Sequence, residues 1–144
     1  MALLRLAHVP APSVESDITV AHAVSEMARQ RVGAVIVFEN GALRGIFTER
    51  DLMLRVVNET RDPQTTLVRD VMTTDVLTIT DASTAEEASD TMLDMHLRHL
   101  PVLDDAGKVL GLLSMRALLE DRLHDLSHEV HSLEQYMAND GPGG

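Results

Sequence analysis

Apolar and polar positions along this chain repeat with two different periods. From Ile18 to Arg31 the apolar residues return every three or four positions, which predicts one face of a helix with Thr19 as its N-cap. Residues 34–38 form a short, β-branched apolar run, and 43–47 form a second one, so both are predicted to be strands. Because Asn40-Gly41 between them is a typical tight-turn pair, the two strands are expected to form a hairpin.

The whole pattern occurs twice in the sequence. ITVAHAVSEM (18–27) aligns with STAEEASDTM (83–92), and VGAVIVFENGALRGIFTERDL (32–52) aligns with LRHLPVLDDAGKVLGLLSMRAL (97–118). The second copy is displaced by 65 residues before the hairpin turn and by 66 residues after it. A polar linker, 58–66, separates the copies. The elements expected from this repeat are helices 48–57 and 84–95, strands 99–103 and 108–113, and a helix beginning at Ser114.

A heptad stripe of apolar residues begins where the second copy ends. Its members are spaced by four and three residues along a helix predicted over 115–137: Leu119, Leu123, Leu126, Val130, Leu133 and Met137. The stripe is expected to pack either on the chain's own repeats or on another chain. In a parallel self-pairing Glu129 would face Glu134 of the other helix, so the charges disfavour that arrangement. The final NDGPGG is expected to be a disordered tail.

Composition narrows the classes of function. The 144 residues suffice for one domain or one pair of small repeats, and 44% of them are hydrophobic. A net charge of −11 and an aromatic content of 2% argue against a nucleic-acid surface, because such surfaces present cations and stacking rings. The absence of cysteine excludes disulfides and thiolate chemistry, which fits a cytoplasmic protein. Neither a signal peptide nor a membrane span is expected.

Each copy ends its hairpin with a Gly-x-x-Ser/Thr motif, GIFTERDL (45–52) and GLLSMRAL (111–118). With VMTTDVLTITDASTAEEASDTM (71–92) and the LPV strand (100–102), these segments resemble cystathionine-β-synthase (CBS) domains in tandem. The resemblance covers roughly residues 12–122. It implies an α/β fold of two βαββα-type repeats packed about a pseudo-twofold axis, here with a long C-terminal helix. The expected division is a first repeat at 1–60, a second at 61–122, and a helical extension with its tail at 123–144.

In that family the paired repeats form a regulatory module that binds adenosyl ligands and has no catalytic activity of its own. The resemblance therefore implies a sensor in signal transduction rather than an enzyme, with no catalytic cofactor. Its ligand would be AMP, ADP, ATP, a dinucleotide such as NAD, or S-adenosylmethionine. A homodimer is expected from the apolar stripe and from the family's habit of dimerising. The sequence identifies neither the preferred ligand nor the regulated partner protein, and it leaves open whether the second cleft is occupied.

Seven residues are expected to contact the ligand: Gly45, Thr48, Asp51, Arg98, His99, Gly111 and Ser114. Thr48 would meet a phosphate and Asp51 the ribose hydroxyls, whereas Ala117 replaces the aspartate in the second copy. The same residues have structural interpretations. Thr-x-x-Asp also resembles a helix capping box, and a glycine in a hairpin strand permits a bend or close packing. The basic pair at 98 and 99 either contacts phosphate or lies at a solvated strand start, with its two side chains on opposite faces.

Other candidate chemistry is weaker. His124, His128 and His131 share one face of the long helix, a spacing that suits a metal ion, but they lie away from the apolar stripe. Solvated histidines are therefore expected, and no metal site is predicted. Arg50 is expected on a solvated helix face. No Walker loop, nucleophile elbow or zinc-protease motif occurs. Ala117 and the stripe suggest a second function, an interaction module whose nucleotide site is vestigial.

Overall fold

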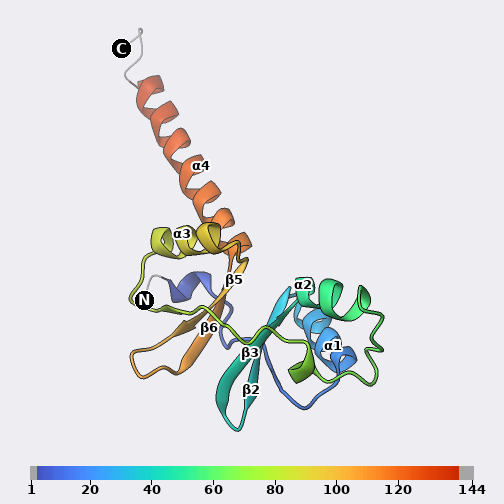
Figure 1. Cartoon of the computed structure of the whole chain (residues 1–144). Helices are drawn as coiled ribbons and strands as arrows, with labels where there is room; N and C mark the ends of the chain where they lie inside the picture. The colour runs from blue at the N-terminus through green and yellow to red at the C-terminus, as the bar shows by residue number, and fades with distance from the viewer. Residues whose placement is uncertain (1–2, 140–144) are drawn as a thin grey trace.

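The chain forms two lobes of the same architecture, each a three-stranded sheet with helices packed on it (Figure 1). The computed structural model describes residues 3–139, so most of the expected tail lies outside the described part. The first lobe contains β1 (Ser13–Glu15), α1 (Val20–Gln30), β2 (Ala34–Glu39), β3 (Ala42–Thr48) and α2 (Glu49–Asp51). The second lobe contains β4 (Ile79–Thr80), α3 (Ala85–Met95), β5 (His99–Leu103), β6 (Val109–Ser114) and α4 (Met115–Asn139). The α/β fold with two βαββα-type repeats is therefore confirmed.

Local sequence signals determine where several of these elements begin and turn. Thr19 and Thr84 cap α1 and α3, because each hydroxyl accepts a hydrogen bond from the third helical N–H, at 3.2 Å and 3.0 Å respectively. Asn40 and Gly41 both have positive φ, 53° and 80°, as a two-residue hairpin turn requires. The predicted Thr19 cap and the Asn40-Gly41 turn depend only on neighbouring residues, and the structure confirms both.

The two sheets share their strand order and their irregularities. In each sheet the first strand is parallel to the second, and the second is antiparallel to the third. The register shifts after Val37 in β2 and after Val102 in β5, which are equivalent positions in the two copies. The internal repeat in the sequence is thus also a repeat in the backbone.

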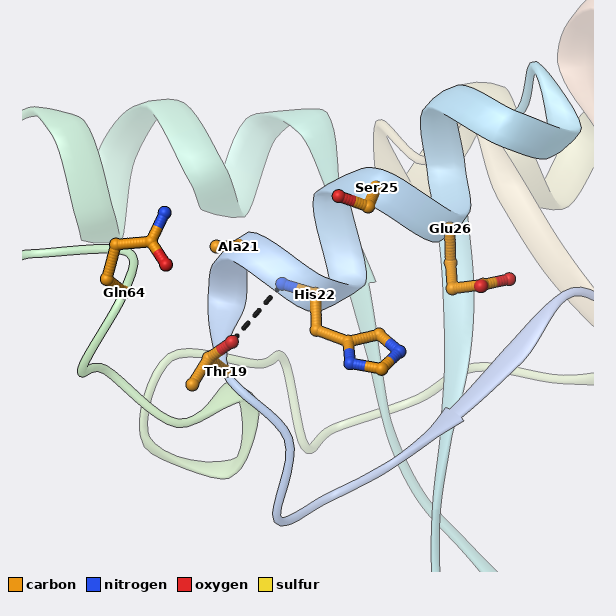
Figure 2. A pocket seen from close by; sticks show the side chains of 6 residues that line it. All are labelled: Thr19, Ala21, His22, Ser25, Glu26 and Gln64. Atoms are coloured by element: carbon orange, nitrogen blue, oxygen red, sulfur yellow. Dashed lines mark hydrogen bonds between the residues drawn. The ribbon is translucent and has the colours of Figure 1, made fainter.

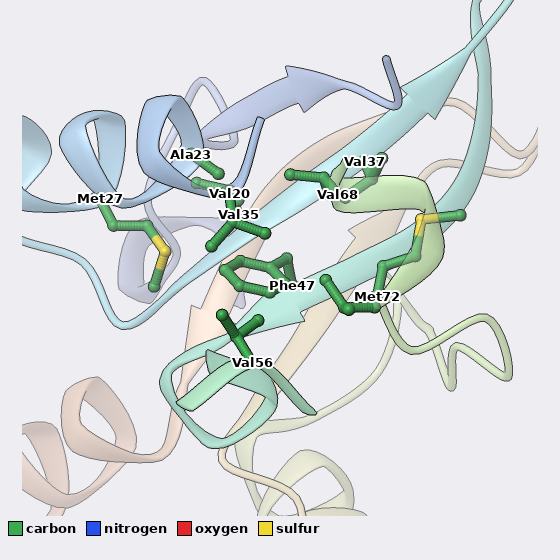
Figure 3. Close-up of a cluster of buried hydrophobic side chains, with 10 residues drawn as sticks. Val20, Ala23, Met27, Val35, Val37, Phe47, Val56, Val68 and Met72 are labelled. Atoms are coloured by element: carbon green, nitrogen blue, oxygen red, sulfur yellow. The ribbon is translucent and has the colours of Figure 1, made fainter. Parts of the chain in front are cut away.

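Each lobe completes its core with a segment from elsewhere in the chain. Leu3 is buried in the core of the second lobe, beside the short helix Leu4–Leu6. Val68 and Met72, which precede the aligned part of the second copy (83–118), are buried in the first lobe around Phe47 (Figure 3). The segment that begins with the turn Val68–Asp70 therefore crosses to the first lobe, and the N-terminal segment lies on the second. The division of the chain at residues 60 and 61 remains a prediction.

The two lobes meet through an apolar contact between their sheets. Ala34, Ile36 and Ile46 of the first sheet pack with Leu112 of the second. Partly buried residues surround this contact: Ala11, Phe38, Leu43, Val76 and Val109. Each fully buried Ile or Leu side chain contributes about 1.5–3 kcal/mol, so this contact holds the two repeats together as one unit.

The helix predicted from Thr48 to Val57 differs from expectation. Only α2 is α-helical, and Leu52–Val57 continue as a π-helical segment, in which the backbone N–H of Asn58 donates to the oxygen of Met53 at 2.9 Å. Such segments are rare and occur often at functional sites. The helix predicted over 115–137 is confirmed as α4, which projects away from both lobes (Figure 1). Within residues 3–139 no helix is long and apolar enough to cross a membrane.

Candidate functional site

Thr48 and Asp51 form a capping box at the start of α2. The Thr48 hydroxyl accepts from the Asp51 backbone N–H at 3.2 Å, and Asp51 Oδ2 accepts from the Thr48 backbone N–H at 3.0 Å. Oδ2 also accepts from the Thr48 hydroxyl at 3.1 Å. The structural interpretation of Thr-x-x-Asp as a capping box is therefore confirmed. It does not exclude a ligand role, because the same groups are the donors and acceptors that a nucleotide would use.

Asp51 also makes contacts beyond its own helix. It is only 6% exposed, and its Oδ1 accepts from the Thr73 hydroxyl at 2.9 Å. The Arg55 guanidinium lies 3.7 Å from the same oxygen and donates to the Met72 carbonyl at 2.8 Å. The buried carboxylate is thus satisfied entirely by hydroxyl, amide and guanidinium groups of the chain itself.

Sequence analysis did not identify Thr73 and Arg55 as parts of this site. Thr73 lies 22 residues from Asp51 and reaches it only because its segment crosses to the first lobe. There it pairs with Ile46 of β3 through backbone hydrogen bonds. No local pattern in the sequence predicts this crossing. Arg55 follows Asp51 by four residues, so the i, i+4 spacing of opposite charges was a usable signal.

The two motif glycines allow the chain's own backbone to approach closely. A Cβ at Gly45 would lie 2.8 Å from the Thr73 carbonyl oxygen and 2.6 Å from Met72 Sδ. A Cβ at Gly111 would lie 3.0 Å from the carbonyl oxygen of His8. Close packing of the hairpin strand therefore accounts for both glycines. Ligand contact at either one remains a prediction.

His99 lies where the second lobe meets the start of α2. A side chain at Gly33 would meet both the His99 imidazole, at 3.4 Å, and the Glu49 carboxylate, at 2.7 Å. Burial and, to a smaller extent, the charge of Arg98 together lower the pKa of His99 to about 4, so the imidazole is neutral at pH 7. Arg98 itself is exposed, and His99 is half-buried. The basic pair thus differs in environment, as strand geometry predicted.

The equivalent region of the second lobe has different side chains. The Ser114 hydroxyl accepts from the Ala117 backbone N–H at 3.1 Å, so the cap is preserved without the carboxylate. His8 occupies the place of Thr73, because it pairs with Leu112 as Thr73 pairs with Ile46. The structure therefore brings Gly111 and Ser114 together but offers them no acidic partner at position 117.

Two other surface features, a hollow along α1 and the histidines of α4, contain none of the predicted ligand residues. Figure 2 shows a shallow hollow along α1, lined by Thr19, Ala21, His22, Ser25, Glu26 and Gln64. None of the seven predicted ligand residues lines it. On α4 the rings of His124 and His128 stack with centroids 6.3 Å apart. Within residues 3–139 no cluster of three or more histidine and acidic side chains is placed to hold a metal ion.

The chain belongs to the CBS domain family, whose model matches residues 6–58 and 68–124. It is 32% identical over 115 residues to the CBS domain-containing protein YhcV of Bacillus subtilis, covering 80% of this chain and 81% of that protein. A crystal structure of a CBS domain shares 34% identity with it at a TM-score of 0.80, covering 85% of this chain and 94% of that one. The resemblance of the sequence to tandem CBS domains is thus confirmed.

The same fold occurs with a bound nucleotide in another protein. The CBS domain protein of Pyrobaculum aerophilum complexed with AMP matches at a TM-score of 0.73 and 24% identity, covering 80% of this chain and 88% of that one. The chain spans only 49% and 61% of the length of the first two curated relatives that it matches. These likenesses support a regulatory CBS module in general, without identifying what it regulates.

Proposed function

We propose that this chain is an adenosyl-nucleotide sensor whose principal site is at Thr48 and Asp51 of the first repeat. In this proposal Asp51 accepts hydrogen bonds from the ribose hydroxyls, and the N-terminal end of α2 with Thr48 meets a phosphate. The main support for this proposal is the buried Asp51 carboxylate, which is surrounded by hydroxyl donors. Ribose presents the same kind of donor, so it can replace them without leaving a buried charge unsatisfied.

The exchange of donors supplies a physical route from binding to a structural change. Three hydrogen bonds and one nearby guanidinium already occupy the Asp51 oxygens, which have about four acceptor sites in total. A ribose with two hydroxyls would therefore displace Thr73. Because Thr73 belongs to the segment that joins the two lobes, its release would alter how the repeats, or two copies of the pair, pack.

The phosphate end of the ligand would approach the basic pair at the lobe boundary. The exposed Arg98 offers a permanent charge, whereas the half-buried His99 is neutral at pH 7. A phosphate placed against His99 would favour the imidazolium and draw a proton from the solvent. Glu49 lies in the same region and would oppose a highly charged phosphate chain. A monophosphate is therefore the first ligand to test, and AMP bound to a protein of the same fold supports that choice.

Calorimetry with AMP tests the site directly. Thr73→Val should bind AMP more tightly than wild type, since the competing hydroxyl is gone, whereas Asp51→Asn should bind at least about tenfold more weakly because each charge-assisted bond contributes about 1.5–3 kcal/mol. Thr74→Val is the matched control, because Thr74 is exposed and adjacent. Equal affinity of wild type and Asp51→Asn would remove Asp51 from the site.

The alternative is an interaction module with a vestigial site. Ala117 and the complete internal satisfaction of Asp51 favour it, since neither requires a ligand. A thermal-shift panel of AMP, ADP, ATP, NAD and S-adenosylmethionine separates the two functions. A ligand at 100 times its dissociation constant stabilises the chain by about 2.7 kcal/mol, whereas a vestigial site gives no shift with any of them.

A further inference from the structure

Helix α4 carries an apolar face that the rest of residues 3–139 leaves uncovered. Its members are 46–70% exposed and follow the heptad spacing: Leu119, Leu123, Leu126, Val130, Leu133 and Met137. On a helix with about 3.6 residues per turn, these side chains form one continuous stripe. A contiguous exposed stripe of this length is typical of an interaction surface.

The stripe points away from the lobe to which α4 is attached. Leu118 is buried in the core of the second lobe, and Asp121 pairs with Arg5 of that lobe at 3.1 Å. These two residues lie on roughly the opposite side of the helix from the stripe. The lobe therefore cannot cover the stripe, and a second helix can approach it from the first turns of α4 onward.

We propose that α4 pairs through this stripe with α4 of a second copy of the chain, in antiparallel orientation. In one register Leu123 lies beside Leu126 of the second copy, and Leu119 lies beside its Val130. That register brings Arg122 against Glu129 on the edge of the seam, and the twofold symmetry repeats the contact. Among residues 3–139 neither Arg122 nor Glu129 makes an ion pair within the chain, so both are available for this contact.

A parallel pair and a fully overlapping antiparallel pair both bring like charges together. A parallel pair places Glu129 against Glu134, and the antiparallel register of full overlap places Glu129 against its own copy and Glu120 against Glu134. In the proposed register Glu120 faces only Ser127. The register that places Leu126 beside Met137 brings Glu129 against Tyr136 and Glu134 against Ser127, so it joins no opposite charges. Charge complementarity therefore favours the proposed orientation and register, at the cost of leaving Leu133 and Met137 without an apolar partner on the stripe.

Charge reversal on the whole chain tests the pairing. In sedimentation equilibrium at low salt, Arg122→Glu and Glu129→Arg should each weaken the dimer about tenfold, because two attractive contacts become repulsive. An equal mixture of the two variants should restore the wild-type affinity, since every contact between them is again Glu against Arg. Asp125→Arg, which changes the charge as much on an outer face of α4, should leave the dimer unchanged.

Three outcomes would overturn the proposal. A stronger dimer with Glu129→Arg would show parallel pairing, because that change removes the contact with Glu134. A wild-type chain that stays monomeric at tens of micromolar has no such interface. A chain truncated after Arg122 that dimerises as well as wild type would assign the interface to the repeats themselves.

Discussion

The two lobes share one backbone plan and differ in the side chains at equivalent positions. In the first lobe Asp51 accepts a hydrogen bond from Thr73, whose backbone pairs with Ile46. In the second lobe Ala117 and His8 hold those positions, and His8 pairs with Leu112 in the same way. Backbone pairing therefore does not depend on the carboxylate. The carboxylate is present in the first lobe alone, so the region around Asp51 differs chemically from its counterpart around Ala117.

The segment that crosses to the first lobe (68–73) packs more tightly there than the N-terminal segment packs on the second lobe. A Cβ at Gly45 would lie closer to Met72 and the Thr73 carbonyl oxygen than a Cβ at Gly111 would lie to His8 and Val9. The first lobe also uses Arg55 to bind the Met72 carbonyl, whereas the equivalent residue, Asp121, pairs with an exposed arginine. The first lobe thus has a closely held segment over its Asp51 carboxylate.

The largest effect is expected from the motif glycines. Gly45→Ala should destabilise the fold by about 3 kcal/mol and Gly111→Ala by about 1 kcal/mol, since overpacking costs about 1–3 kcal/mol and the nearest backbone atom would lie 2.8 Å from the new Cβ at Gly45 against 3.0 Å at Gly111. Urea unfolding of both variants measures the difference. Equal losses of stability in the two variants would mean that the two segments pack equally closely on their glycines.

Variants at Asp51 and Ala117 test whether the two equivalent regions differ in ligand binding. Asp51→Ala should weaken AMP by about 10- to 150-fold, the equivalent of one charge-assisted hydrogen bond of about 1.5–3 kcal/mol. A deoxyribose analogue should bind wild type more weakly than AMP and lose little further in the variant. Ala117→Asp should add a second, weaker binding event. Calorimetry resolves both, and unchanged AMP affinity in Asp51→Ala would leave Asp51 with its capping role alone.

His99 has no counterpart in the first copy, where buried Ala34 holds the equivalent position. Its pKa of about 4 lies below the ordinary value of 6.5, so the unfolded chain binds a proton first as the pH falls. The contribution of neutral His99 is complete above pH 6.5 and is lost between pH 6.5 and 4. Between pH 7 and pH 5 wild type should lose about 2 kcal/mol more stability than His99→Gln. Parallel stability curves for the two proteins would show that His99 is not buried in solution.

The smallest effect is expected from the arginines that hold the two incoming segments. Arg5 is 61% exposed in its pair with Asp121, so Arg5→Ala should cost at most about 0.5 kcal/mol. Arg55→Ala should cost about 1 kcal/mol, because it also removes the hydrogen bond to the Met72 carbonyl. Chemical denaturation compares the two. A larger loss from Arg5→Ala would reverse the ranking of the two segments.

Much of this architecture follows from the sequence alone, because its signals are local. The period of the apolar residues predicted α1, α3, α4 and both hairpins, and the threonine caps and the Asn40-Gly41 turn needed only neighbouring backbone. The internal repeat predicted two similar lobes. The contrast between Asp51 and Ala117 was also visible in the aligned motifs, and the heptad spacing predicted the stripe on α4.

Tertiary structure alone decided what surrounds Asp51. Thr73 reaches that carboxylate because the 68–73 segment crosses to the first lobe, and the N-terminal segment lies on the second. The same crossing explains why Gly45 and Gly111 are needed, and no pattern near either glycine indicates it. Periodicity did not locate the short strands β1 and β4, which only the family resemblance implied, and it did not predict the π-helical segment, since a few residues show no period. Local patterns record how a segment prefers to fold, whereas contacts between distant segments depend on burying the apolar surface of the whole chain.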